Sequence, residues 1–330
     1  MFWMLMACDM MVEQYNVAAD PTDTTEFIFT VPKGSNARKI GGPLQEIGVI
    51  NDADDFTTYV KLSKQGSCIK AGRFPLNRSM TPEKILSTLC GTPMSNDKPF
   101  TILEGWRIRE IDAALAKEGW IKAGEYKTLA EDPSLFSTPY ALPKETLEGY
   151  LYPETYMLTP DRFDCKKFIQ RQLDMLTETF YTPNKDGIQK SNRSMHELVI
   201  MASMLEREEP KIENRPMVAG ILWKRLDEPC PSKHPCTLGV DATSHYTLED
   251  WNDRKGLLRN LKNTKDPYNT RLREGLPPTA IGSPSIDSLK ASLNPKSSVY
   301  WYYLHDSKQI LRPARNGREH ERNRRKYNVY

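Results

Sequence analysis

Carboxyl groups end an apolar run in the stretch "ASMLEREE", residues 202–209. The residues before the first acid leave almost no polar face, and a helix that is apolar all round is buried. Glu206 falls on the stripe of Val199 and Ala202, which carries it into the interior or to the floor of a cleft. A carboxylic acid among apolar neighbours keeps its proton to higher pH, as a general acid working near neutrality requires. Glu206 is therefore the candidate catalytic residue.

Two alternatives stand beside this interpretation of Glu206. Charged residues gather at helix ends for trivial reasons, so Glu206 is equally expected to pair with an arginine such as Arg215 or Arg225. Glu208 and Glu209 are rival acids in the same turn, and we expect both to be solvated.

A second candidate is "LEGYLYPETY", residues 147–156. Pro153 excludes a continuous helix, and strands rarely place Glu and Pro among aromatic residues, so the stretch predicts a rigid loop. Its tyrosine rings offer flat surfaces on which a ligand can stack, and Glu148 can hold a neighbouring group. The alternative is that Tyr150, Tyr152 and Tyr156 only pack a domain junction.

The elements that must position these residues can be traced from their local signals. Ser194 with Glu197 forms a capping-box signature that opens the helix of Glu206, and Pro210 stops it. Further predicted elements are a helix in "RPMVAGILWKRL", a strand, a turn at Asp241 and a helix start in "TLGVDATSHYTLED", a helix over 284–293, and a hairpin of "SVYWYYLHD" with "QILRPA". The long loop of "YNTRLREGLPPTAIGSPSIDSLKASLNP" is typical of segments that line sites.

The first half of the chain contains an internal repeat. Residues 29–50 and 100–121 match at an offset that aligns Phe with Phe, Gly with Gly, and the apolar residues of a helix. Each copy predicts a strand, a turn at a glycine, and a helix that ends at Gly48 or Gly119. Between the copies, "KAGRFPL" predicts a strand and "SMTPEKILSTLCG" a helix capped by Thr81. Such modules resemble the lysin-motif type that binds amino sugars; plain structural spacers are the alternative.

Length and composition bound the class of protein. The chain has 330 residues, 38% apolar content and a net charge of +3 with interspersed signs, which fits two soluble domains and does not suggest nucleic acid as a partner. The basic C-terminal stretch "RPARNGREHERNRRKY" is more typical of a solvated helix than of a binding patch. No CxxC pair, histidine cluster or phosphate-binding glycine loop occurs, so we expect no metal and no cofactor.

Two features remain open from the residues alone. Cys230 and Cys236 bracket a short Pro-rich loop that a disulfide could close outside the cytosol. The apolar N-terminus "MFWMLMACDMMV" is shorter than the roughly 20 residues of a spanning helix, so it is either part of a longer anchor, a trimmed signal, or a hydrophobic tail.

Six stretches in order resemble the YceG-like family of endolytic murein transglycosylases, over about Phe29 to Tyr327. They are "LEGYLYPETY", "ASMLEREE", "RPMVAGILWKRL", "GVDATSHY", "YNTRLREGLPPTAIGSPSIDSLKASLNP" and "EHERNRRKY". The resemblance implies an α+β protein with small lysin-motif-like N-terminal modules before a mixed α+β catalytic domain. We divide it into a partial anchor or leader (1–20), a lysin-motif-like region with the repeat (21–125), and the catalytic domain (126–330).

The implied reaction is non-hydrolytic cleavage of the bond between N-acetylmuramic acid and N-acetylglucosamine, leaving a 1,6-anhydro end and terminating nascent strands. The family's catalytic glutamate falls on Glu206. Because the sugar's own C6 hydroxyl attacks, one glutamate can protonate the leaving oxygen and then accept the hydroxyl proton, whereas ordinary glycosidases need two carboxylates. The expected substrate-binding residues are Glu148, Tyr150, Tyr152, Asp241, Asn269 and Thr270, and His320 matches a family histidine with a structural role.

The resemblance also implies partners and a location. Glycan strands are the expected substrate, peptidoglycan synthases are candidate partners, and an N-terminal anchor would make the chain a single-pass protein of the bacterial inner membrane with its catalytic part on the extracytoplasmic side. Lys224, Ala242 and Arg271 depart from the family pattern, and Lys224 bears on substrate preference. The alternatives are a hydrolase of the same glycan and a non-catalytic wall-binding scaffold that recruits synthases.

Overall fold

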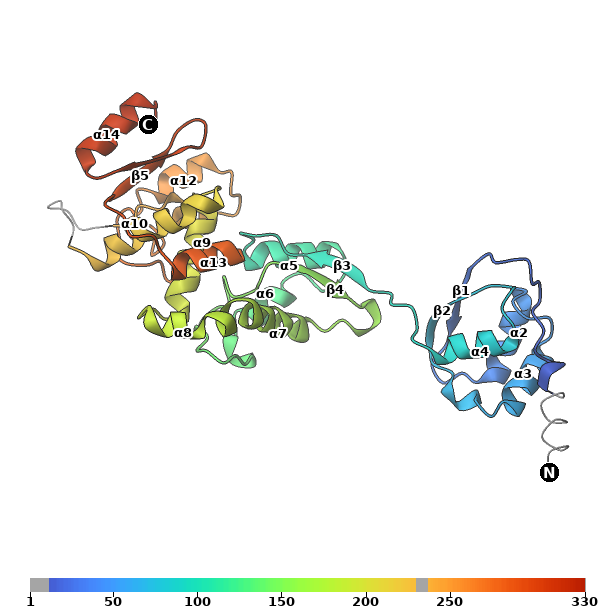
Figure 1. Cartoon of the computed structure of the whole chain (residues 1–330). Helices are drawn as coiled ribbons and strands as arrows, with labels where there is room; N and C mark the ends of the chain where they lie inside the picture. Colours follow the sequence, from blue (N-terminus) through green and yellow to red (C-terminus); the bar gives the residue numbers. More distant parts are fainter. Residues whose placement is uncertain (1–11, 230–236, 330) are drawn as a thin grey trace. The chain divides into compact units, whose positions relative to one another are not determined.

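The computed structural model describes residues 12–229 and 237–329. Contacts divide the chain into two compact units, Met1–Asp97 and Lys98–Tyr330, and each is described by itself (Figure 1). The sequence predicted a boundary near residue 125, whereas residues 98–125 pack with the second unit. The physical reason is strand pairing, because the strand of the second repeat copy finds its partner downstream.

Unit 1 is a two-stranded antiparallel sheet covered by helices. Its elements are β1 (Phe27–Val31), α2 (Ala37–Glu46), α3 (Ala53–Leu62), β2 (Gly72–Leu76) and α4 (Pro82–Cys90). Phe29 of β1 pairs with Phe74 of β2, and both side chains are buried with Leu44 and Phe56. The predicted strand and helix between the repeat copies are confirmed, with the Thr81 side chain capping α4.

A disulfide joins Cys68 to Cys90 in unit 1 and so ties the segment before β2 to the end of α4. No local pattern predicts this pair, since the two cysteines lie 22 residues apart. The pair considered from sequence, Cys230 and Cys236, lies outside the described residues. Cys165 is a buried free thiol.

Unit 2 opens with the same order of elements as unit 1. β3 (Lys98–Thr101), α5 (Ile108–Lys117), α6 (Glu125–Ala130) and β4 (Thr155–Leu158) follow one another, and β3 pairs antiparallel with β4. The predicted repeat is confirmed at its turns. Gly34 and Gly105 have φ of 75° and 76° between strand and helix, and Gly48 and Gly119 have φ of 71° and 79° after the helix. These left-handed conformations are ones that glycine adopts without strain.

The rest of unit 2 is helical, with one hairpin. Its elements are α7 (Cys165–Leu176), a π-helical turn (Thr177–Tyr181), α8 (Thr182–Lys190), α9 (Met195–Glu208), α10 (Arg215–Asp227), α11 (Asp241–Tyr246), α12 (Arg254–Asn260), α13 (Ile286–Leu293), β5 (Tyr302–His305), β6 (Leu311–Ala314) and α14 (Gly317–Lys326). Helix α9 packs against α10, α11 and α13 and forms the centre of the unit 2 core (Figure 1). The predicted helices and the β5–β6 hairpin are confirmed. The structure is thus mixed α+β with small sheets.

Two expectations are wrong in the described part of the chain. The strand expected before Asp241 is absent, because residues 237–240 run as a loop directly into α11. No helix among residues 12–229 and 237–329 combines the length and apolar character needed to cross a membrane. The expectation of a single-pass inner-membrane protein with an anchor in residues 1–20 therefore finds no spanning helix in the described part of the chain, and residues 1–11 lie outside that part.

The disulfide supplies a test of unit 1. Replacing Cys68 and Cys90 together by serine should lower the free energy of unfolding by about 3 kcal/mol, because the unfolded chain regains the freedom that closing this loop removes. Urea denaturation of the full chain measures the change, and added reductant should destabilise only the unsubstituted protein. Detection of Cys68 and Cys90 as free thiols in the folded, air-oxidised protein would contradict the assignment.

Candidate functional site

Glu206 occupies the last turn of α9. The helix opens with the predicted capping box, in which Ser194 and Glu197 each hold the other's backbone N–H. All side chains from Leu198 to Leu205 are buried, as their all-round apolar pattern predicted. The chain thus delivers Glu206 at the end of a rigid element, where the side chain keeps 7% of its surface exposed.

Four donors hold the Glu206 carboxylate. Arg215 Nη1 and Nη2 donate to Oε2 and Oε1 at 3.1 and 3.0 Å, and the backbone N–H and the hydroxyl of Ser285 donate to Oε2 at 2.9 and 2.5 Å. The pairing with Arg215 that the sequence offered as an alternative is present, whereas Arg225 donates to the carbonyl of Trp301 at 2.8 Å. A bidentate arginine and two further donors stabilise the carboxylate form. Oε1 has a single partner, so it keeps acceptor capacity.

The segment 281–285 forms one wall beside Glu206. It is fixed to α9 at two points, since the Ile281 N–H donates to Ser203 Oγ at 3.0 Å and Ser285 binds Glu206. On its other side it pairs with the β3–α5 turn: the Gly105 N–H donates to the Ser283 carbonyl at 2.6 Å, and the Ser283 N–H donates to the Trp106 carbonyl at 2.7 Å. This brings the turn of the second repeat copy to the end of α9.

The loop 147–153 packs against the same segment. A Cβ at Gly149 would lie 2.3 Å from the Cβ of Ala280 and 2.9 Å from the Cγ1 of Val199, so only glycine permits this close approach. Tyr152 keeps 7% of its surface, and burial first, then the charges of Glu154 and Glu104, raise its pKa. The loop 147–153 therefore packs beside Val199 in the middle of α9, while the segment 281–285 and the β3–α5 turn reach the C-terminal end of the helix.

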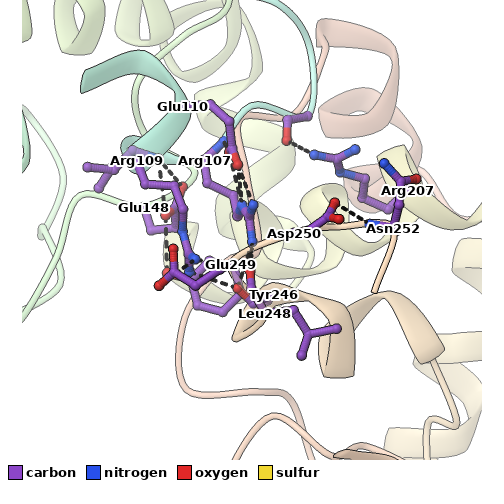
Figure 2. Close-up of polar contacts among 12 residues, drawn as sticks. Arg107, Arg109, Glu110, Glu148, Arg207, Tyr246, Leu248, Glu249, Asp250 and Asn252 are labelled. Atoms are coloured by element: carbon purple, nitrogen blue, oxygen red, sulfur yellow. Dashed lines mark hydrogen bonds and ion pairs between the residues drawn. The ribbon is translucent and has the colours of Figure 1, made fainter. Parts of the chain in front are cut away.

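Glu148 lies inside the protein and not on a free surface. It accepts hydrogen bonds from the Ile108 N–H at 3.2 Å and from the Tyr246 hydroxyl at 3.1 Å; Glu148 and Tyr246 are both labelled in Figure 2. Burial raises the pKa of Glu148 to about 7, against the lowering effect of these two donors. Its position at the N-terminus of α5 links the tyrosine-rich loop to the second repeat copy.

Tyr150 and Tyr156 are fully buried. The Tyr150 hydroxyl lies 3.1 Å from His196 Nδ1, and the Tyr156 hydroxyl donates to the Tyr152 carbonyl at 2.8 Å. Their burial fits the packing alternative considered from sequence. Binding of substrate by Glu148, Tyr150 and Tyr152 stays a prediction.

Arginines that the sequence reading overlooked fix the segment 246–252 (Figure 2). Arg107 and Arg109 each donate to the carbonyl oxygens of both Tyr246 and Leu248, at 2.8 to 3.0 Å. Arg107 also forms an ion pair with Glu110. Their only sequence signal was Arg109, which matches an arginine in the first repeat copy.

The remaining predicted binding residues hold loops together. Asp241 forms an ion pair with Arg271, with one contact at 2.7 Å, and both side chains are well exposed. Asn269 is buried and donates to the carbonyls of Asn260 and Asn263 at 2.9 and 3.1 Å.

Thr270 is buried as well. It bonds Val240 through its hydroxyl at 3.1 Å and receives the Val240 N–H at 3.0 Å. The structure shows no contact of Asp241, Asn269 or Thr270 with Glu206 in the described part of the chain, and their role in binding stays a prediction.

The expectation that Glu208 and Glu209 are solvated is wrong. Glu209 is buried against His305, 2.9 Å from its Nε2, and the hydrogen bond from His305 lowers the pKa of Glu209. Glu208 accepts from the Tyr303 hydroxyl at 3.2 Å, and burial raises its pKa. Sequence spacing missed this because the partners come from the β5 strand, about 95 residues downstream.

No group of three or more potential metal ligands occurs within residues 12–229 and 237–329. Two surface hollows of about 390 and 420 Å³ lie around Tyr140, Leu142 and Pro143, and Glu206 lines neither. The site at α9 is therefore defined by its polar residues and converging loops.

The contact at Gly149 predicts a large stability effect. Gly149→Ala places a side chain on a backbone with φ of 84° and against Ala280, whereas Gly124→Ala meets the same restriction at φ of 88° with no atom within 4 Å. We expect a loss of about 1–2 kcal/mol for Gly124→Ala and a further ~1–3 kcal/mol for Gly149→Ala. Thermal or urea unfolding measures both, and equal losses would contradict the close packing of the loop.

The raised pKa of Glu148 predicts a pH dependence of stability. Between its ordinary value of 4.5 and about 7 the unfolded chain releases the Glu148 proton while the folded chain keeps it, so stability falls as pH rises through this window. The loss from this group is on the order of 3 kcal/mol. Glu148→Gln should remove it, so that the variant gains stability relative to the unsubstituted protein between pH 5 and pH 8 in urea denaturation. A constant difference between the two proteins would contradict the shift.

Comparison with known proteins places these features in a family. Residues 29–326 match the model of the YceG-like family. The chain is 29% identical over 313 residues to an endolytic murein transglycosylase of Bacillus subtilis (strain 168), covering 90% of this chain and 83% of that protein. It is 27% identical to one of Streptococcus pneumoniae serotype 2 (strain D39 / NCTC 7466), covering 89% of this chain and 57% of that longer protein.

A solved structure agrees with these matches. The crystal structure of a YceG-like protein from Listeria monocytogenes superimposes with a TM-score of 0.59 at 26% identity, covering 91% of this chain and 99% of that one. Because the family model spans both units, the chain belongs to the YceG-like family.

Proposed function

We propose that this chain is an endolytic peptidoglycan transglycosylase. It cleaves the bond between N-acetylmuramic acid and N-acetylglucosamine within glycan strands and leaves 1,6-anhydro ends, which terminates nascent strands. The relatives in Bacillus subtilis and Streptococcus pneumoniae are named endolytic murein transglycosylases, and this supports the proposal. The observation that carries it in this chain is Glu206, presented at the end of buried α9 where the 103–106 and 281–285 segments meet.

Glu206 is the proposed catalytic carboxylate. The rigid helix and the contacts with Arg215 and Ser285 hold its position, which is what proton transfer at a bound glycosidic bond demands. Cleavage without water needs no second carboxylate to activate a water molecule, because the attacking group is the C6 hydroxyl of the substrate itself.

The proposal extends to binding. Unit 1 is a lysin-motif-like module that holds glycan, which its self-contained order of strand, two helices and strand supports. In unit 2, Glu148, Tyr150, Tyr152, Asp241, Asn269 and Thr270 shape the saccharide site, the buried ones by fixing its loops. Peptidoglycan synthases are the proposed protein partners.

The reaction can be tested with uncrosslinked glycan strands. The full chain should generate anhydro ends that mass spectrometry detects, and Glu206→Gln should reduce the rate by about 10²–10⁴-fold. Glu213→Gln is the matched control, since Glu213 is exposed in the short helical turn Ile212–Asn214 that follows α9, and the substitution removes the same charge. Because glutamine would place an amide N–H₂ against Arg215, unfolding curves must show that the Glu206 variant is folded at the assay temperature.

The outcomes separate the alternatives. Reducing ends in place of anhydro ends would indicate a hydrolase. Strand binding without cleavage, unchanged in Glu206→Gln, would indicate a wall-binding scaffold and would remove Glu206 from catalysis.

A further inference from the structure

A second carboxyl group, that of Glu104, faces the region of Glu206. Glu104 lies in the turn between β3 and α5, immediately before Gly105, and its side chain is exposed. In the described part of the chain, no hydrogen bond or ion pair engages this carboxyl group. An exposed, unpartnered acid at the edge of a proposed active site is available to a bound substrate.

The backbone contacts fix Glu104 close to Glu206. Gly105 is hydrogen-bonded to Ser283 at 2.6 Å, and Ser285, two residues further along, donates to Glu206 at 2.9 Å. Two residues of extended chain span at most about 7 Å. The residue that follows Glu104 and the carboxylate of Glu206 are therefore bound to neighbouring points of one segment, 283–285.

The environments of the two acids are opposite. Glu206 receives four hydrogen bonds, two of them from a guanidinium group. Glu104 receives none. Although Glu104 is exposed, its carboxyl group loses part of its hydration to neighbouring atoms; this raises its pKa, and the negative charge of Glu206 raises it further, against a lowering effect of Arg215. Paired carboxyl groups whose environments differ in this way take opposite roles in proton transfer.

We propose that Glu104 is the proton donor to the leaving oxygen and that Glu206, as a carboxylate, receives the proton of the attacking hydroxyl. This rests on the proposed transglycosylase function. It divides between two residues the work that the sequence assigned to Glu206 alone.

The step balances without any co-reactant. The Glu104 proton moves to the glycosidic oxygen as the bond from C1 to that oxygen breaks, and the C6 oxygen forms the new bond to C1. The C6 hydroxyl proton moves to Oε1 of Glu206, which has free acceptor capacity. Two products result: one glycan has a free 4-hydroxyl group, and the other has a 1,6-anhydro end. Exchange of one proton with solvent restores Glu104 and Glu206 to their starting forms.

Leaving-group dependence tests this division. A proton donor matters for the poor leaving group of a natural strand and little for a phenol of low pKa, whereas a proton acceptor matters for both. The probes are uncrosslinked glycan strands and a nitrophenyl glycoside of an oligosaccharide ending in N-acetylmuramic acid. Glu104→Gln should lose about 10²–10⁴-fold in kcat/KM on strands and less than about 10-fold on the aryl glycoside. Glu206→Gln should lose comparably on both, and Glu213→Gln on neither.

The opposite patterns overturn the proposal. If Glu104→Gln cleaves both substrates like the unsubstituted protein, Glu104 takes no part in the reaction. If it is impaired equally on both, it positions substrate and donates no proton. If Glu206→Gln loses activity on strands but little on the aryl glycoside, Glu206 is the proton donor and the two roles are reversed. Absence of anhydro ends from the unsubstituted protein is a separate result and would remove the proposed function itself.

Discussion

Helix α9 is buried on every side until its last turn, and this constraint organises the second unit. A helix of this kind must end in polar residues that find partners, because unpaired charges at the edge of a core are costly. The three acids of this turn bind different partners. Glu206 binds Arg215 and Ser285. Glu208 binds Tyr303, and Glu209 binds His305. The acids of one turn thereby tie α10, α13 and the terminal hairpin to a single point.

Arg207 completes this arrangement from the same turn. It donates to the Gly105 carbonyl and lies over the Trp251 ring at 4.1 Å, and His245 stacks on that ring at 4.9 Å. The turn of α9 therefore also reaches the second repeat copy and the segment after α11. The proposed chemistry lies where the largest number of distant segments is fixed.

The structural features that depend on residues close in sequence could be predicted from the sequence. The capping box of α9, its apolar pattern, the repeat with its glycine turns, and the β5–β6 hairpin depend on residues close in sequence, and each is present. The partners of Glu208 and Glu209, the Cys68–Cys90 bond and the approach of Glu104 depend on pairings across tens to nearly two hundred residues. Spacing cannot encode these. The observed domain boundary differs from the predicted one for the same reason: β3 pairs with β4 and not with a strand of unit 1.

Arg107 and Arg109 hold the segment after α11 through its backbone, and this affects which of its side chains can be substituted. Both arginines bind carbonyl oxygens, which every amino acid supplies whatever its side chain. The side chain of Glu249 is almost wholly exposed, so replacing it has little effect on how the two arginines bind this segment. The loop can therefore accumulate substitutions at its tip while its path stays fixed, because that path depends on Arg109 of α5 and on Arg107, which caps the helix.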